Sequence, residues 1–398
     1  MNTRPVPLSF VFMLASVFAM SPLAIDLYLP TIPRIADDFN SPVQQLAITL
    51  SLYVFGLSLG QFIGGPLSDY WGRRRVLFIG LLVFASSSLV LAFAQSLEVF
   101  WGARVIQALG GGFAAVVVPA LIRDNTEGRA TAKLFSLIGL ITIFAPAVAP
   151  SLGTLIFSIA GWRAIFVALA LYASVIGVIT WRFLHSPSIV SPSPAQAPHE
   201  SLLQRYRYVL SNGLAMRYLL AQGFSFSVMM NFLVNSSVVY IEKYQQSEAA
   251  FSILFASNII ALAAANRLNA YLLNTVSPAR ILMWSVSLQT AACTVLLVAT
   301  PFSPPLWLVV AMVVISIGCM GGVMGNTQAC CLHFFPRHSG IASALQGSAQ
   351  YLIGALLSAA STLFVSEKIW PLSVSMAACA LLALWALPRP SRFEQAAS

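Results

Sequence analysis

The stretch GGPLSDYWGRRR, residues 64–75, lies between two long apolar runs and contains one acid and three consecutive arginines. Only 8% of the 398 residues are charged, whereas 58% are hydrophobic. A soluble protein carries about 25% charged residues, because polar groups must cover its surface. Such a concentration of charge in one short segment has three possible explanations. The charges set the membrane topology, bind nucleic acid or take part in a conformational change.

The apolar runs have the length of membrane-spanning helices, because about 20 residues cross a hydrocarbon core as a helix. Barrel strands would alternate with polar residues, so helices are indicated. The first run resembles a signal peptide but is too long for one, and many runs follow it. The sequence thus predicts an all-α membrane protein with twelve transmembrane helices. The predicted spans are 8–30, 44–66, 76–95, 99–121, 133–157, 163–185, 214–240, 248–273, 279–300, 305–330, 339–365 and 368–388.

The basic residues predict the orientation. With a cytoplasmic N-terminus, sixteen of the 21 Lys and Arg residues fall on the cytoplasmic side, four on the far side, and Arg104 within a span. The side richer in these residues is the cytoplasmic one. We therefore expect a multi-pass protein of a bacterial cytoplasmic (inner) membrane with both termini in the cytoplasm. The net charge of +9 mostly reflects this bias, which argues against nucleic-acid binding.

The longest polar break, residues 186–207, is rich in Pro, Ser and Ala and divides the spans into two sets of six. Proline holds such a tether fairly extended. Six plus six spans is the pattern of transporters built from two parallel repeats, so we predict two six-helix bundles with pseudo-twofold symmetry. The predicted parts are an N-terminal bundle (1–185), a cytoplasmic linker (186–213) and a C-terminal bundle (214–398).

Several segments resemble a known family. GPLSDYWGRRR is similar to the loop signature of the major facilitator superfamily, roughly G-x-x-x-D-R/K-x-G-R-R/K, although Tyr70 stands where a basic residue is usual. The chain further resembles the Bcr/CflA-type drug/proton antiporters, over its whole length and most strongly over residues 20–165. This resemblance implies the major facilitator fold and proton-coupled export of drugs or other small organic compounds by alternating access. The matching segments are AIDLYLP (24–30), SLYVFGLSLGQFIGGPLSD (51–69), RVIQALGGG (104–112), LIRD (121–124) and FAPAVAPSLGTL (144–155).

The resemblance also implies a conformational latch around the loop. In the family the loop aspartate faces the N-terminus of span 11, here near Ser339, and pairs with an arginine and with an acid at the end of span 4. Glycines would allow the tight turn and the close helix approach that the loop needs. The alternative is that the arginines only enforce topology, which we favour for Arg75. The predicted latch residues are Gly65, Asp69, Gly72, Arg73, Arg74 and Asp124.

Asp26 is the only acid inside the twelve predicted spans, since the other eleven Asp and Glu residues fall in loops, at span ends or in the tails. A charged side chain in a bilayer helix costs about 2.5–3.5 kcal/mol on insertion scales, so Asp26 should face a cavity. Desolvation favours the neutral carboxyl and a nearby cation favours the carboxylate, as a proton carrier requires. By resemblance, Arg104 is its partner, and the polar Gln107 follows one turn later. The alternatives are a permanent packing role for Asp26 and, for Arg104, snorkelling to the interface.

Span 5 contains Pro146, Pro150 and Gly153, residues that kink or thin a helix. The resemblance implies an antiporter helix that seals the cavity against proton leak. Ala145 stands where many antiporters have glycine.

The spans of the second half contain no acid in their interior but offer amides and hydroxyls instead. Ser227, Asn231 and Asn235 are spaced i, i+4, i+8 and so share one helix face. These groups either bind substrate or hydrogen-bond one helix to another. The candidate substrate-binding residues are Tyr53, Gln61, Gln107, Ser227, Asn231, Asn235, Asn326 and Gln350.

Other function classes find little support. No phosphate-binding loop is present, so ATP-driven transport is not indicated, and no nucleophile–base pair suggests an enzyme. The five cysteines lack metal-ligand spacing, so we expect neither a metal nor a cofactor. We expect a monomer whose partners are a small-molecule substrate, protons and the lipid bilayer. The alternatives are an exporter of one natural metabolite (a nucleoside, amino acid or sugar) and a transporter-like sensor or lipid-handling protein.

Overall fold

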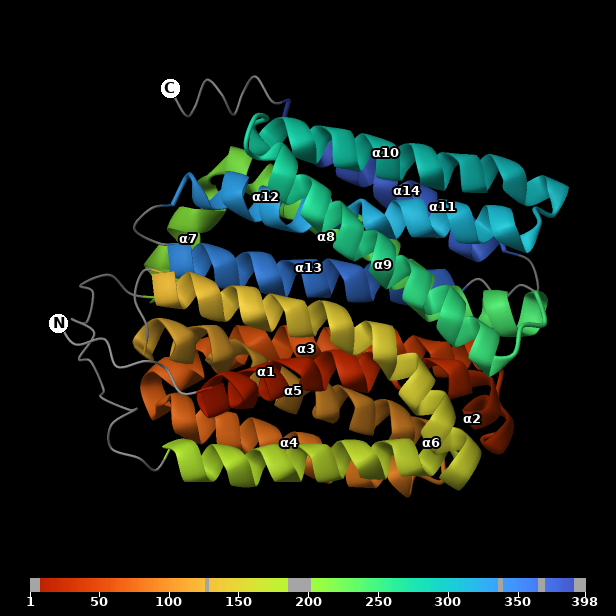
Figure 1. Cartoon of the computed structure of the whole chain (residues 1–398), viewed down its shortest axis with the longest axis horizontal. Helices are drawn as coiled ribbons and strands as arrows, with labels where there is room; N and C mark the ends of the chain where they lie inside the picture. The colour runs from red at the N-terminus through yellow and green to blue at the C-terminus, as the bar shows by residue number, and fades with distance from the viewer. Residues whose placement is uncertain (1–7, 126–128, 185–201, 336–338, 364–368, 390–398) are drawn as a thin grey trace. The chain divides into compact units, whose positions relative to one another are not determined.

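The computed structural model describes residues 8–125, 129–184, 202–335, 339–363 and 369–389. Within these ranges the chain is helical and contains no β-strand (Figure 1). Each of the twelve predicted spans coincides with a helix, a pair of consecutive helices, or one arm of a bent helix. Among the described residues, nine helices are long and apolar enough to cross a membrane, and Trp370–Ala386 is a shorter apolar helix. The prediction of an all-α membrane protein is confirmed.

The chain divides into two compact units. Unit 1 comprises Met1–Ile35 and Gly56–Pro198, and unit 2 comprises Ala36–Phe55 and His199–Ser398. One division falls inside the helix α2 (Ile32–Asp38), which passes from unit 1 to unit 2 after Ile35. Another falls inside the helix α3 (Val43–Trp71), whose first half belongs to unit 2 and whose second half belongs to unit 1.

Unit 1 is built around five long helical segments. The first helix, α1, ends at Asp26 and is followed by a short 3-10 helix and α2. Helix α6 contains two predicted spans, because Gly161 (φ 77°, ψ 173°) interrupts the helical backbone. The two arms of α6 run in opposite directions (Figure 1). The helices are α1 (Leu8–Asp26), η1 (Leu29–Thr31), the first half of α2, the second half of α3, α4 (Arg73–Ala92), α5 (Leu97–Asn125) and α6 (Arg129–Leu184).

Glycines bring α5 against two neighbours in unit 1. A Cβ atom at Gly110 would lie 2.6 Å from the carbonyl oxygen of Gly80 on α4. A Cβ atom at Gly112 would lie 2.7 Å from the carbonyl oxygen of Leu57 on α3. Small residues at such positions let helix backbones approach closely in a membrane, where apolar burial between helices gives no driving force. The run of three glycines at 110–112 therefore serves helix packing.

The connection between α3 and α4 is shorter than the sequence predicts. Helix α3 continues to Trp71 and α4 begins at Arg73, so only Gly72 lies between them. Gly72 has φ 90° and ψ 145°, a backbone conformation that side chains with a Cβ atom rarely adopt. The expected tight turn is therefore made at Gly72. At Gly65, by contrast, an added Cβ atom would meet only Val116 at 3.8 Å, so no close helix approach depends on this glycine.

Unit 2 is centred on α8, which contacts α12, α13 and α14. The Asn212 side chain caps α8 by accepting a hydrogen bond from the Ala215 N–H at 3.0 Å, and a π-helical turn extends the other end of α8. The end of the predicted extended linker is helical as α7, while residues 185–201 lie outside the described ranges. The helices are α7 (Leu202–Ser211), α8 (Gly213–Ser237), η2 (Val238–Lys243), α9 (Glu248–Leu272), α10 (Pro278–Ala299), η3 (Thr300–Phe302), α11 (Leu306–Gly318), α12 (Met320–Leu332), α13 (Ser339–Thr362) and α14 (Trp370–Ala386).

Candidate functional site

The carboxyl group of Asp26 lies at the last residue of α1, inside unit 1. The residue is 4% exposed, and its side chain forms no hydrogen bond or ion pair with any other residue in the described part of the chain. The carbonyl end of a helix carries partial negative charge, so the end of α1 opposes a carboxylate at this position. Burial opposes it as well, because the charged form loses its hydration.

Arg104 on α5 brings a guanidinium group to the end of α1. Its side chain is fully buried, and its Nη1 donates a hydrogen bond to the carbonyl oxygen of Ala24 at 3.2 Å. The guanidinium carbon lies 4.5 Å from the centroid of the Tyr28 ring. Ala24 and Tyr28 stand two residues before and after Asp26, so the guanidinium is held beside the end of α1. Arg104 therefore does not snorkel to the interface.

A chain of hydrogen bonds fixes the orientation of Arg104. Its Nη1 also donates to Gln107 Oε1 at 2.7 Å, and Gln107 Nε2 donates to Ser88 Oγ on α4 at 2.8 Å. Ser88 Oγ in turn donates to the Phe84 carbonyl oxygen at 2.6 Å. Gln107 is fully buried and both ends of its amide are engaged. The structure thus places Gln107 as a support for Arg104, whereas the sequence suggested a substrate contact.

The first arm of α6 reaches the same point. A Cβ atom at Gly153 would overlap the carbonyl oxygen of Leu27, so only glycine permits this approach of α6 to the end of α1. Pro150 is buried and Pro146 half-buried on the same arm. We call Asp26, Tyr28, Arg104, Gln107 and Gly153 the Asp26 cluster. It joins α1, α5 and α6 within unit 1.

The predicted latch is described only in part, because the side chains of Asp69, Asp124 and Ser339 lie outside the described residues. Arg73 Nη1 donates a hydrogen bond to Ser68 Oγ at 2.6 Å. The Arg74 guanidinium lies 4.9 Å from the ring centroid of Trp181 on the second arm of α6, which is a cation–π contact within unit 1. Tyr70 is 86% exposed.

The three polar residues of α8 share one face, as their spacing predicts, but they use much of their hydrogen-bonding capacity on their own helix. Ser227, Asn231 and Asn235 each donate to the carbonyl oxygen four residues earlier. Asn235 Nδ2 also donates to Ser361 Oγ on α13 at 3.1 Å. Asn231 Oδ1 is buried and has no hydrogen-bond partner in the described part of the chain. Of these three residues, Asn231 therefore keeps a spare acceptor.

The remaining candidates lie in different surroundings. Asn326 Nδ2 donates to Asn269 Oδ1 at 2.7 Å, which joins α12 to α9. Tyr53 is fully buried in unit 2, and Gln61 is half-buried in unit 1. Gln350 Oε1 accepts a hydrogen bond from Gln222 Nε2 on α8 at 2.5 Å.

Neither Gln222 nor Gln346 is among the substrate-binding candidates chosen from the sequence. Gln346 Nε2 donates to Gln222 Oε1, so three glutamines from two helices form one cluster. The available signal was the residue type, because a primary amide is costly within a bilayer unless it finds partners.

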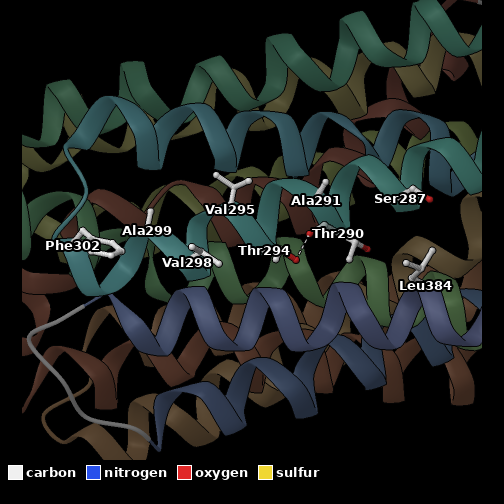
Figure 2. Close-up of a pocket in the computed structure, with 9 residues that line it drawn as sticks. All are labelled: Ser287, Thr290, Ala291, Thr294, Val295, Val298, Ala299, Phe302 and Leu384. Carbon is white, nitrogen blue, oxygen red and sulfur yellow. Dashed lines mark hydrogen bonds between the residues drawn. The ribbon is translucent and has the colours of Figure 1, made fainter.

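A hollow in unit 2 contains none of the predicted site residues. It has a volume of about 670 Å³ and is lined by residues of α10, η3 and α14 (Figure 2). Its threonines are tied to the backbone, since Thr294 Oγ1 donates to the Thr290 carbonyl oxygen and Thr290 Oγ1 donates to the Ala380 carbonyl oxygen. The hollow is an apolar groove along exposed side chains such as Val298 and Phe302.

Comparisons with known proteins agree with this architecture. Residues 14–359 match the family described as the Major Facilitator Superfamily. The bicyclomycin resistance protein homolog of Haemophilus influenzae is 25% identical over 386 residues, which cover 97% of each chain. The multidrug resistance protein MdtL of Citrobacter koseri is 29% identical over 332 residues, 83% of this chain and 82% of its own. A crystal structure of a D-xylose-proton symporter has the same fold, with a TM-score of 0.76, 15% identity and coverage of 96% and 98%.

Proposed function

The chain belongs to the Major Facilitator Superfamily, whose members are multi-pass membrane transporters, and we propose that it exports small organic compounds, including drugs, in exchange for protons. The relatives that carry this proposal are named for resistance to bicyclomycin and to multiple drugs. We place the protein in a bacterial cytoplasmic membrane as a monomer, with both termini in the cytoplasm. It acts as a transporter and not as an enzyme.

The observation that supports proton coupling is the arrangement around Asp26. Burial and the carbonyl end of α1 oppose a permanent charge on this carboxyl group. The Arg104 guanidinium is held two residues away along the chain, at the Ala24 carbonyl oxygen. A buried carboxyl group binds a proton readily and releases it when a cation approaches. We therefore assign proton binding to Asp26 and the response to its charge to Arg104.

In the proposed cycle, substrate and proton compete for the Asp26 cluster. Protonation from outside releases the substrate, and a conformational change then returns the proton to the cytoplasm. A proton that crosses 100 mV releases about 2.3 kcal/mol. This energy corresponds to roughly fifty-fold accumulation of substrate per proton, before any pH gradient is added.

Substrate-induced proton flux in inside-out membrane vesicles tests the proposal. A pH gradient is set, and bicyclomycin, a panel of drugs, and a nucleoside, an amino acid and a sugar are added in turn. We expect drugs to dissipate the gradient with wild-type protein. We expect no dissipation with Asp26→Asn, because an amide does not exchange protons in this pH range.

The matched control is Glu98→Gln, which neutralises an exposed acid on α5 of the same unit. We expect this variant to behave like wild type. Proton flux that survives in Asp26→Asn contradicts the assignment of Asp26. A response to a natural metabolite alone contradicts drug export and supports a dedicated metabolite exporter.

A further inference from the structure

Three buried glutamines join α8 to α13 in unit 2. Gln346 Nε2 donates to Gln222 Oε1, and Gln222 Nε2 donates to Gln350 Oε1 at 2.5 Å. All three side chains are at most 6% exposed. Gln346 and Gln350 are one helical turn apart on α13, so both reach the single glutamine of α8. We call these residues the glutamine triad.

The triad retains one unused acceptor. Gln346 Oε1 is buried and forms no hydrogen bond with any other described residue. A buried amide oxygen without a donor destabilises the protein, so a purely structural role would leave this group as a net cost. An arriving donor would satisfy it.

Gln289 on α10 shows how a structural glutamine is satisfied in the same unit. It is fully buried, its Oε1 accepts from Ser225 Oγ at 2.5 Å, and its Nε2 donates to the Ser316 carbonyl oxygen at 3.1 Å. Both ends of this amide are engaged, and the bonds link α8, α10 and α11. Gln346 differs in its open oxygen.

Two aromatic side chains lie next to the triad in the sequence of α8 and α13. The rings of Phe226 on α8 and Tyr351 on α13 form an edge-to-face pair with centroids 5.2 Å apart. Gly354 lies against the Phe226 ring, which keeps the two helices close at this level. A few polar groups beside aromatic side chains are the usual composition of a small-molecule site.

We propose that the glutamine triad is a substrate subsite in unit 2, in which Gln346 Oε1 accepts a hydrogen bond from a neutral hydroxyl or amide N–H of the transported compound. This subsite rests on the proposed export function and extends it, because it gives the C-terminal part a role in selecting uncharged donor groups. Gln222 and Gln350 hold the Gln346 amide in place, and the aromatic pair contacts apolar parts of the substrate.

Binding of a matched pair of compounds tests the subsite. Bicyclomycin, which carries hydroxyl groups, and its O-methyl ethers are titrated against purified wild type, Gln346→Met and Gln289→Met, and binding is followed by the shift in melting midpoint. We expect wild type to prefer one hydroxyl compound over its ether by about 2- to 10-fold, the effect of one net hydrogen bond. We expect Gln346→Met to lose this preference and Gln289→Met to keep it.

Stability without any added compound provides a second test. Gln346→Met leaves one unpartnered amide oxygen, that of Gln222, where wild type has one on Gln346. Gln289→Met instead removes the acceptor of Ser225 and the donor to Ser316. We therefore expect a lower melting midpoint for Gln289→Met than for Gln346→Met.

The subsite is wrong if wild type does not distinguish the compounds. It is also wrong if Gln346→Met distinguishes them as well as wild type does. A melting midpoint of Gln346→Met as low as that of Gln289→Met also overturns it, because the amide is then structural. The proposed export function is tested separately, because the vesicle assay measures substrate-induced proton flux and the titration measures binding. Discriminating binding without proton flux would retain the subsite and refute the coupling.

Discussion

Replacing Gly153 with alanine adds a methyl group where α6 meets the end of α1. The new Cβ atom would overlap the Leu27 carbonyl oxygen and lie 2.7 Å from its carbonyl carbon. These are backbone atoms, so no side-chain rotation relieves the overlap and α6 must move away. Overpacking of this kind costs about 1–3 kcal/mol. Alanine also favours a helix over glycine by about 1 kcal/mol, which offsets part of the loss.

Gly177→Ala on the second arm of α6 is the matched control. No atom outside its own helix lies within 4 Å of a Cβ atom placed there, so this variant gains the helix propensity without the overlap. The apparent stabilities of the two variants should therefore differ by about 1–3 kcal/mol, the overpacking term alone. Melting midpoints of the purified proteins in one detergent measure the difference. Equal midpoints would show that α6 does not approach Leu27 as described.

The same displacement should act on the Asp26 cluster, since Leu27 follows Asp26 directly. We expect Gly153→Ala to reduce substrate-induced proton flux in vesicles, while Gly177→Ala retains it. If Gly153→Ala is destabilised but its substrate-induced proton flux equals that of wild type, then the packing of α6 against Leu27 does not affect proton coupling.

Two further substitutions probe other parts of unit 1. Gln107→Leu removes the acceptor of Arg104 Nη1 and the donor to Ser88, and a hydrogen bond to a charged group contributes about 1.5–3 kcal/mol. Proton flux should fall by roughly ten-fold or more, whereas wild-type flux would assign Gln107 no part in holding Arg104. Gly72→Ala forces a Cβ atom into a φ of 90°, which costs about 1–2 kcal/mol. Its melting midpoint should fall below that of Gly213→Ala, at an unobstructed helical glycine, and equal midpoints would argue against this turn geometry.

The spans could be predicted from the sequence because a bilayer imposes one length and one composition on every crossing helix. The turn at Gly72 followed from the special backbone of glycine. The length of the α3–α4 connection did not follow, because charged residues such as Arg73 and Arg74 are equally compatible with a loop and with a helix end. The hydropathy of the sequence did not indicate that α3 and α4 are separated by a single residue.

The site was predictable in residue type but less so in partners. Asp26 and Arg104 stand out as charges within apolar runs, and the structure brings them to the same end of α1. The role of Gln107 depends on Ser88, a residue of another helix, and one sequence carries no record of such a contact. The contacts within the glutamine triad could not be predicted for the same reason, since Gln222 becomes conspicuous only when α13 is set against α8.

The single-residue link at Gly72 has a mechanical consequence. Two helices joined by a long loop can slide independently, whereas a one-residue joint leaves no slack. Any axial shift of the second half of α3 is therefore transmitted to α4, and through the contact of Arg74 with Trp181 to the last arm of α6. The segment of residues 64–75 therefore makes α3 and α4 move together. A few flexible residues inserted beside Gly72 would let the two helices shift independently while leaving each helix intact.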